Sequence, residues 1–292
     1  MLNAAEKVCL VTGATAGIGR VIARLLAESG ATVLVHGRNE VKGRDIVQSI
    51  IAETSNDKVK FVKADLANLS DVQRLATKLN EDLPRLDVII NNAMHASVNR
   101  EVSSDGYEKT FAVNHLAHFF LNGLLMNKLR AARGRIVVVS SDAHRSAKFD
   151  FENIMLTKKY GFTRAYAQSK LANVWYTREF AKRLSGDGVS INALSPGSVR
   201  TYDEKKLPLS LSLIMAVLGP IINVSAEEGA ATPVYLALSP EVVGLSGEYF
   251  KKCKVASVSK LGADDACAKK LWDMCIDILK GYDPDFVGKL SA

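Results

Sequence analysis

Short apolar runs alternate along the chain with longer segments in which apolar residues recur every three or four positions. The first pattern is typical of buried β-strands and the second of amphipathic helices. Strands are expected at residues 8–11, 31–36, 58–64, 86–90, 135–139 and 189–194, with helices between them, including 39–53 and 105–128. This alternation predicts an α/β fold, a doubly wound, mostly parallel sheet of about seven strands with helices on both faces.

Several helix ends carry sequence signals. Gly30 is placed to end the first helix, and the pairs Ser70 with Gln73 and Ser225 with Glu228 match a capping box at a helix start. Residues 264–280 have apolar positions at helical spacing, and we interpret them as a docking helix or an oligomer contact. The chain has 292 residues, and we expect one domain over residues 1–292.

A glycine-containing turn follows the first predicted strand and precedes the first helix. Residues 12–19 read TGATAGIG. Glycines in this context let the backbone approach a phosphate, and the start of the helix supplies free N–H groups and the positive end of its dipole. An ordinary tight turn is the alternative.

The end of the second predicted strand bears on the choice of dinucleotide. An acidic residue there binds the ribose 2′-hydroxyl of NAD, whereas a nearby arginine accommodates the 2′-phosphate of NADP. This chain has Gly37 at that place, followed by Arg38. We therefore expect NADP(H) to be preferred over NAD(H), unless Arg38 is only a solvated residue at the start of a helix.

Tyr166 and Lys170 lie four residues apart in a helical segment, so their side chains share one helix face. A free tyrosine has a pKa near ~10, and a neighbouring cation favours the phenolate. The pair is a candidate general acid/base. Taken alone, the same spacing more often produces only a surface contact.

Composition and charge narrow the function classes. The formal net charge is +7, but the basic residues are scattered, so nucleic acid is not expected as a partner. The four cysteines have no metal-ligand spacing, which favours a reduced, intracellular protein. His115 and His118 are three apart with no evident third ligand, and no metal is expected. The first seven residues do not resemble a signal peptide.

Residues 207–224 are almost free of charge and are interrupted by Pro220. The stretch is too short and broken for a spanning helix. We favour a lid over an apolar substrate, around residues 200–225. A segment that dips into a membrane surface and a cover for the protein's own core are the alternatives.

Taken together, the motifs resemble those of the short-chain dehydrogenase/reductase family across nearly the whole chain. The likeness is greatest to its retinol-dehydrogenase-like branch, through residues 113–119, 166–173 and 246–250. The family resemblance is carried by the turn at 12–19, Asp65, residues 91–93, Asn114, Ser141, Tyr166 with Lys170, and the segment 196–201.

The resemblance implies a Rossmann fold and a role for each matching residue. Tyr166 would exchange a proton with the substrate oxygen, Lys170 would lower the pKa of Tyr166, Ser141 would polarise the carbonyl, and Asn114 would hold a water. Asp65 would contact the adenine. The residues expected to bind the cofactor are Gly13, Thr15, Gly17, Ile18, Gly19, Arg38, Asp65, Leu66, Asn92, Ala93, Tyr166, Lys170, Pro196, Gly197, Val199 and Thr201.

Two features depart from the family pattern. Met94 stands where the family usually has glycine after Asn-Asn-Ala, and His95 follows, so a side chain there either crowds the cofactor or reaches the substrate. Ser141 lies farther upstream of Tyr166 than is usual. The extra residues, 143–162, resemble an insertion of the retinol-dehydrogenase-like branch, and we favour Ser141 over Ser140.

The expected function is an NADP-dependent oxidoreductase that interconverts an apolar aldehyde or ketone (a retinoid, steroid or lipid-like carbonyl) and its alcohol. The competing class is a non-catalytic NADP-binding protein that regulates or recognises a partner. We expect an intracellular, cytoplasmic protein or one peripheral to a membrane. The family resemblance adds a homodimer or homotetramer as an expectation.

Overall fold

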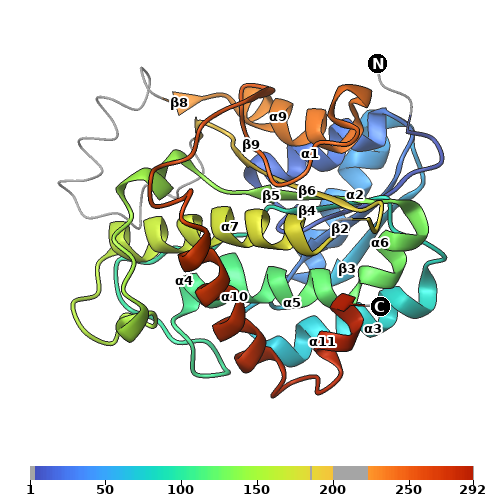
Figure 1. The fold of residues 1–292 in the computed structure, drawn as a ribbon. Coiled ribbons are helices and arrows are strands. Elements are labelled where there is room, and N and C mark those ends of the chain that lie inside the picture. The colour runs from blue at the N-terminus through green and yellow to red at the C-terminus, as the bar shows by residue number, and fades with distance from the viewer. Residues whose placement is uncertain (1–3, 185, 200–222, 292) are drawn as a thin grey trace.

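The computed structural model describes residues 4–184, 186–199 and 223–291, and within them eight strands form one sheet (Figure 1). Their order across the sheet is β10-β9-β6-β5-β4-β1-β2-β3, and every pairing is parallel except β9 with β10. The strands are β1 (Val8–Val11), β2 (Thr32–Gly37), β3 (Val59–Lys63), β4 (Val88–Asn91), β5 (Arg135–Val139), β6 (Ser190–Ser195), β9 (Tyr249–Lys251) and β10 (Lys254–Val255).

This arrangement confirms the predicted doubly wound sheet, with one strand more than the expected number. The extra strand, β10, is two residues long and follows a tight turn in which Lys252 and Cys253 both have positive φ, 50° and 59°. Turns of this kind usually contain Asn or Gly. Because neither is present here, the sequence carried no signal for the hairpin.

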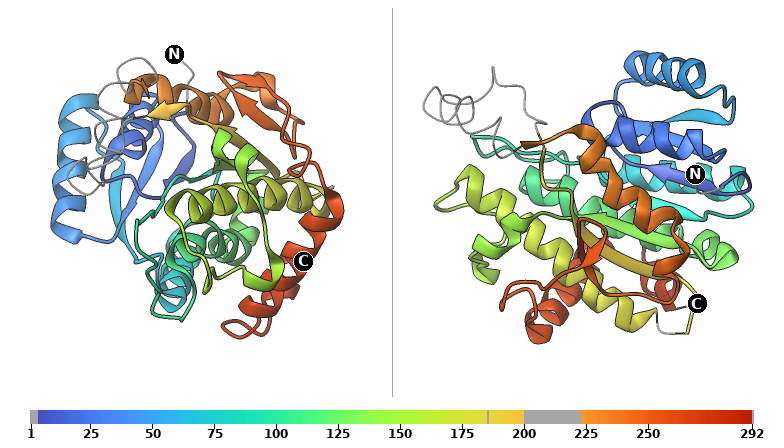
Figure 2. Two further views of the ribbon diagram at one scale, coloured as in Figure 1. Left: turned by 90° about the vertical axis from the view of Figure 1, so that its left-hand side faces the viewer. Right: turned by 90° about the horizontal axis from the view of Figure 1, so that it is seen from above.

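Helices cover both faces of the sheet (Figure 2), and each face has its own apolar core. On one face the buried side chains of Ile22 and Leu26 in the first helix pack with Val11 and Val33 of the strands. The helices of that face are α1 (Gly17–Glu28), α2 (Glu40–Thr54) and α9 (Ala226–Leu238). Those of the other face are α3 (Leu69–Asp82), α5 (Ala117–Leu124) and α7 (Phe162–Arg183).

The C-terminal part of the chain adds an outer layer on α7 and α5 (Figure 1). It consists of α10 (Asp265–Leu279) and α11 (Phe286–Ser291). The Trp272 ring of α10 packs 4.6 Å from the Phe119 ring and 5.2 Å from the Phe180 ring, centroid to centroid. The predicted segment 264–280 is thus a helix docked within the chain. Asp264 caps it by accepting a hydrogen bond from the Cys267 N–H at 2.9 Å.

The start of α3 differs from the prediction. Asn68 is the N-cap, because its side chain accepts a hydrogen bond from the Asp71 N–H at 3.1 Å. Ser70 lies inside the first turn and is exposed, so the expected capping box of Ser70 and Gln73 is wrong. The box of Ser225 and Glu228 at the start of α9 is confirmed, with both of its hydrogen bonds present.

The helix expected over residues 105–128 is shorter at its start and broken. Asp105 lies outside it, because its carboxylate accepts a hydrogen bond from the Leu69 N–H at 2.9 Å. The Glu108 carboxylate then caps the start by accepting from the N–H groups of Thr110 and Phe111, both at 2.8 Å. The helical elements are α4 (Lys109–Phe111), a π-helical turn (Ala112–Leu116), α5, and α6 (Met126–Ala132).

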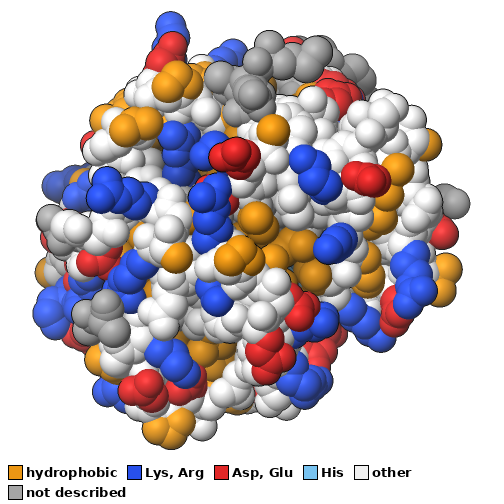
Figure 3. Space-filling view, turned by 90° about the vertical axis from the view of Figure 1, so that its right-hand side faces the viewer, with side chains coloured by type: hydrophobic (Ala, Val, Ile, Leu, Met, Phe, Trp, Pro, Cys, Tyr) orange, Lys and Arg blue, Asp and Glu red, His pale blue; other side chains and the backbone are white. Residues whose placement is uncertain are grey.

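Near the carboxyl end of the sheet, β7 (Ser198–Val199) and β8 (Asn223–Val224) form a separate parallel pair. Residues 200–222, which contain Thr201 and most of the proposed lid, lie outside the described residues. In the described part of the chain no helix is both long and apolar enough to cross a bilayer. On the face shown in Figure 3, Lys and Arg side chains are interspersed with Asp and Glu.

Candidate active site

A cavity of about 640 Å³ opens where the carboxyl ends of β1 to β6 meet. In an open α/β sheet this is the edge at which ligands bind. The structure brings most of the predicted site residues to its wall. These are Gly13, Thr15, Gly17, Ile18, Gly19, Arg38, Asp65, Leu66, Asn92, Ala93, Ser141, Tyr166, Lys170, Pro196 and Gly197.

The turn between β1 and α1 forms one end of this cavity. The Thr12 hydroxyl oxygen accepts hydrogen bonds from the N–H groups of Asn92 and Ala93, each at 2.9 Å, which binds the turn to the end of β4. A Cβ atom at Gly19 would overlap the carbonyl oxygen of Gly13. At the start of α1, Ala16 offers no side-chain cap to the first N–H groups. The turn is therefore a close-packed backbone segment of the kind that can bind an anion.

The end of β2 lies beside that turn. A Cβ atom at Gly37 would be 2.6 Å from the Thr15 Cγ2 atom, so an acidic side chain there would force Thr15 to shift. Arg38 follows, exposed, on the cavity wall. His36, the residue before Gly37, is buried. Its Nδ1 accepts a hydrogen bond from the Gly13 N–H at 3.2 Å, and burial lowers the pKa of His36 to about 4. His36 thus holds the glycine turn in place as a neutral imidazole.

Tyr166 and Lys170 lie on one face of α7 and both line the cavity. The Lys170 Nζ atom is 5.6 Å from the centroid of the Tyr166 ring. The ammonium group of Lys170 is buried and donates a hydrogen bond to the Val139 carbonyl oxygen at 2.8 Å. The pair is therefore a feature of the cavity wall rather than a surface contact.

The protonation of the pair differs from the expectation. Burial raises the pKa of Tyr166, opposed by a hydrogen bond from the Ser141 hydroxyl. Burial lowers the pKa of Lys170 to about 8. The expected lowering of the Tyr166 pKa by Lys170 is thus not found in this structure, because desolvation disfavours the charged form of both groups.

The two serines after β5 have different surroundings. Ser140 is buried, and its hydroxyl donates a hydrogen bond to the Lys170 carbonyl oxygen at 2.8 Å. The Ser141 hydroxyl oxygen accepts from the Ala143 N–H at 3.1 Å, and its proton remains available to Tyr166 or to a ligand. Ser141 is consequently the better placed of the two to meet a substrate.

Asn114 lies in the π-helical turn and is not on the cavity wall. Its Oδ1 accepts from the His95 N–H at 2.6 Å, and its Nδ2 donates to the His95 carbonyl oxygen at 3.1 Å and to Ser169 Oγ at 3.0 Å. With its side chain occupied in this way, Asn114 braces the loop after β4. The expectation that Asn114 holds a water stays a prediction.

Met94 and His95, the departures noted in the sequence, both line the cavity. Met94 is 37% exposed. His95 Nε2 is 3.6 Å from a Glu101 carboxylate oxygen, and that same oxygen accepts a hydrogen bond from Lys109 Nζ at 2.9 Å. Burial lowers the pKa of His95. Both side chains are therefore placed to meet a ligand.

Three further residues considered in the sequence lie in other elements. Val199 belongs to β7. His115 and His118 do not converge: His115 Nδ1 is 3.1 Å from Asn173 Oδ1, whereas His118 Nε2 is 2.9 Å from Thr12 Oγ1. They are satisfied core histidines.

Sequence reasoning missed several residues of the wall. Most flank a recognised motif in the sequence or lie one helical turn from one, which is the signal that could have found them. They are Ala16, His36, Ala64, Ala67, Lys109, Val113, Val139, Asp142, Phe162 and Ser195.

Comparison with known proteins agrees with this geometry. A family model described as short chain dehydrogenase matches residues 7–210. The chain is 38% identical over 274 residues to retinol dehydrogenase 12 of Homo sapiens, covering 94% of this chain and 86% of that protein. It is 39% identical over 272 residues to retinol dehydrogenase 13 of Homo sapiens, covering 91% and 82%.

Among solved structures, the Pseudomonas aeruginosa RhlG/NADP active-site complex is similar with a TM-score of 0.69 and 26% identity, covering 85% of this chain and 95% of that one. The shared fold, the cavity at the carboxyl ends of the strands and the identity over nearly the whole chain lead to one assignment. This chain is an oxidoreductase of the short-chain dehydrogenase/reductase family, in its retinol-dehydrogenase-like branch.

Proposed function

We propose that this oxidoreductase interconverts an apolar aldehyde or ketone and its alcohol, with NADP(H) preferred over NAD(H). The observation that carries the proposal is the meeting of Ser141, Tyr166 and Lys170 on the wall of the same cavity as the glycine turn and Arg38. Phosphate recognition and proton transfer need these groups within reach of a single bound ligand.

The cavity fits a dinucleotide phosphate. The turn at Gly13 and Gly19 leaves no space for side chains, and the uncapped start of α1 directs N–H groups outward. Gly37 offers no carboxylate to a 2′-hydroxyl, while the guanidinium of Arg38 suits a 2′-phosphate. When bound, the cofactor supplies or accepts the hydride. Asp65, Leu66, Asn92, Ala93, Pro196 and Gly197 would line its remaining length.

Tyr166 is the proposed proton donor to the substrate oxygen during reduction. Its raised pKa keeps the phenol protonated at neutral pH, which suits donation. The Ser141 hydroxyl would orient and polarise the carbonyl beside it. Lys170, with a pKa of about 8, holds the wall beneath Tyr166 through the Val139 carbonyl and keeps positive charge nearby at neutral pH.

An apolar substrate is supported by side chains near Tyr166. The Phe162 ring lies nearly parallel to the Tyr166 ring, with an interplanar angle of 7° and centroids 6.5 Å apart. Met94 and Val113 add further apolar surface to the cavity. The names of the relatives make retinoids the first class to try, with steroid and lipid-derived carbonyls next.

The test uses purified protein, NADPH and a panel of retinal, steroid ketones and aliphatic aldehydes, with NADPH consumption followed by absorbance. We expect reduction of at least one apolar carbonyl. Tyr166→Phe should lower kcat by about 100-fold or more, while NADPH binding, measured by fluorescence, is kept. Tyr160→Phe is the matched control, because the Tyr160 hydroxyl donates to the Ser97 carbonyl oxygen instead of lining the cavity.

If NADPH binds but no carbonyl is reduced, or if Tyr166→Phe is as active as the wild type, the enzymatic proposal fails. Binding without turnover would favour the competing class, a non-catalytic NADP-binding protein.

A further inference from the structure

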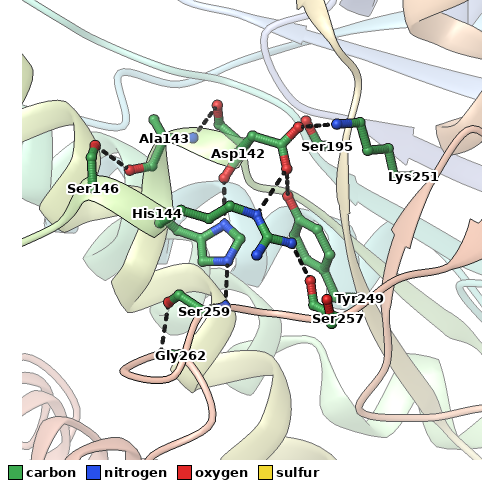
Figure 4. Close-up of polar contacts among 12 residues, drawn as sticks. Asp142, Ala143, His144, Ser146, Ser195, Tyr249, Lys251, Ser257, Ser259 and Gly262 are labelled. Atoms are coloured by element: carbon green, nitrogen blue, oxygen red, sulfur yellow. Dashed lines mark hydrogen bonds and ion pairs between the residues drawn. The ribbon is translucent and has the colours of Figure 1, made fainter.

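The short turn after Ser141 is attached to a distant part of the chain. Residues 142–146 form a single 3-10 turn, with Ser141 as its N-cap. Figure 4 shows that side chains of this turn reach β9 and the segment around Ser257 and Ser259, more than 100 residues later. The surroundings of Ser141 are therefore determined partly by the C-terminal region.

His144 provides the first of these attachments. Its ring is buried, its Nδ1 is 2.7 Å from the Ser141 carbonyl oxygen, and its Nε2 is 3.2 Å from the Ser259 backbone nitrogen (Figure 4). A backbone N–H can only donate, so Nε2 accepts from Ser259 and Nδ1 carries the proton that is donated to Ser141. The bridge requires one tautomer of the neutral imidazole. Burial lowers the pKa of His144, which maintains that form.

Asp142 provides the second attachment. One carboxylate oxygen is 2.6 Å from Lys251 Nζ on β9, and the other accepts a hydrogen bond from the Tyr249 hydroxyl at 3.4 Å. Arg145 Nε lies 3.6 Å from that second oxygen, and the Arg145 guanidinium also donates to the Ser257 carbonyl oxygen. The turn is thus held on both sides of the His144 bridge.

We propose that His144 is a positioning residue for Ser141, and that its bridge to Ser259 makes the C-terminal segment part of the active-site scaffold. The imidazole holds the carbonyl of Ser141, and the backbone so held directs the Ser141 hydroxyl toward the cavity and Tyr166. The Asp142–Lys251 contact also helps to hold the backbone next to Ser141 in place. This inference rests on the proposed function, because Ser141 is the group through which His144 acts.

The expected fall in kcat follows from the sensitivity of catalysis to the positions of the reacting groups. A displacement of about 1 Å in a reacting group can cost about 100-fold in rate. We therefore expect loss of the bridge to lower kcat by about 10- to 100-fold. A histidine that merely fills the core would lower stability but would not reduce kcat through Ser141 in particular.

The experiment is a double-mutant cycle between His144 and Ser141, assayed with NADPH and the best carbonyl of the panel. His144→Phe removes both hydrogen bonds and keeps a ring, and His144→Asn keeps a donor for Ser141 but cannot reach Ser259. We expect kcat to fall most for His144→Phe and less for His144→Asn, with the Kd of NADPH changed less than threefold. In a Ser141→Ala background, His144→Phe should lower kcat by no more than about threefold.

Two further variants keep the test decisive. Lys251→Met removes the Asp142 attachment from a half-exposed position and should lower kcat by about two- to tenfold, again only when Ser141 is present. It remains informative if His144→Phe fails to fold. Ser146→Ala is the control, because its exposed hydroxyl donates to the Ala143 carbonyl oxygen within the same turn, so its kcat should equal that of the wild type.

Additive effects of His144→Phe and Ser141→Ala, or a wild-type kcat in His144→Phe, would overturn the inference. Loss of NADPH binding in step with activity would also overturn it, by placing the effect on the cofactor cradle. An inactive wild-type protein would instead refute the proposed function, so the two failures are distinguishable.

Discussion

The Lys170 ammonium donates its hydrogen bond to the carbonyl oxygen of Val139, 2.8 Å away, at the end of β5. This contact attaches the centre of α7 to the strand that leads to Ser141. It also buries a titratable group, whose pKa is lowered from 10.5 to about 8. The folded protein therefore releases the Lys170 proton at a lower pH than the unfolded chain does.

That difference predicts a pH-dependent stability. Between pH 8 and 10.5 the unfolded chain binds more protons at Lys170 than the folded protein, so the contribution of Lys170 to stability rises with pH. The free energy of unfolding of the wild type, minus that of Lys170→Met, should increase by about 1–3 kcal/mol across this window. Urea unfolding of both proteins without cofactor, at several pH values, measures it. A difference that stays constant from pH 7 to 10.5 would contradict the burial argument.

Arg38→Ala tests the choice of cofactor. A hydrogen bond to a charged group contributes about 1.5–3 kcal/mol, so the Kd of NADPH should rise by about 10- to 100-fold. The Kd of NADH, which lacks the 2′-phosphate, should change little. Arg44→Ala is the matched control, because Arg44 is an exposed arginine of α2 that pairs with Glu40. Equal preference for the two cofactors in the wild type would refute the assignment of Arg38.

Trp272→Ala tests whether α10 belongs to the core of the chain. The indole packs on Phe119, Tyr176 and Phe180, so its truncation should lower the free energy of unfolding by about 3–5 kcal/mol. Asp273→Ala, on the exposed side of the same helix, should change it by less than about 0.5 kcal/mol. Equal effects of the two substitutions would mean that α10 is not docked as described.

The start of α3 has two candidate N-caps: Asn68, which the structure shows, and Ser70, which the sequence predicted. Asn68→Ala removes an observed cap and should cost about 1 kcal/mol, whereas Ser70→Ala should be nearly neutral. Denaturant unfolding of the two variants, compared with the wild type, provides the measurement. The reverse order of effects would restore the capping box of Ser70 and Gln73.

These cases show what the sequence could and could not predict. The sheet was predictable because each buried strand is a short apolar run, and the cavity wall because motifs such as the turn at Gly13 and the pair Tyr166 and Lys170 follow those strands. The partners of single polar groups were not predictable. The Asp105 carboxylate accepts from the Leu69 N–H at the start of α3 instead of beginning the helix expected at 105, and the Asn114 amide binds the His95 backbone. Such choices depend on distant segments meeting in the folded chain.

The protonation of the site was unpredictable for the same reason. Helical spacing places Tyr166 beside Lys170 but says nothing of how deeply either is buried. Burial raises the pKa of Tyr166 and lowers that of Lys170 to about 8. The pair had been expected to stabilise its charged forms, whereas desolvation dominates in the folded protein.

The Thr15 side chain limits the space beside Gly37, and this affects any attempt to alter the cofactor preference. An aspartate introduced at Gly37 to favour NAD would place its Cβ against the Thr15 methyl group, 2.6 Å away. The turn proposed to bind phosphate and the position proposed to face the adenosine ribose therefore constrain each other. A side chain at position 37 forces Thr15 to shift, so Gly37→Asp alone should weaken the binding of both dinucleotides, and a smaller residue at Thr15 should relieve part of that loss.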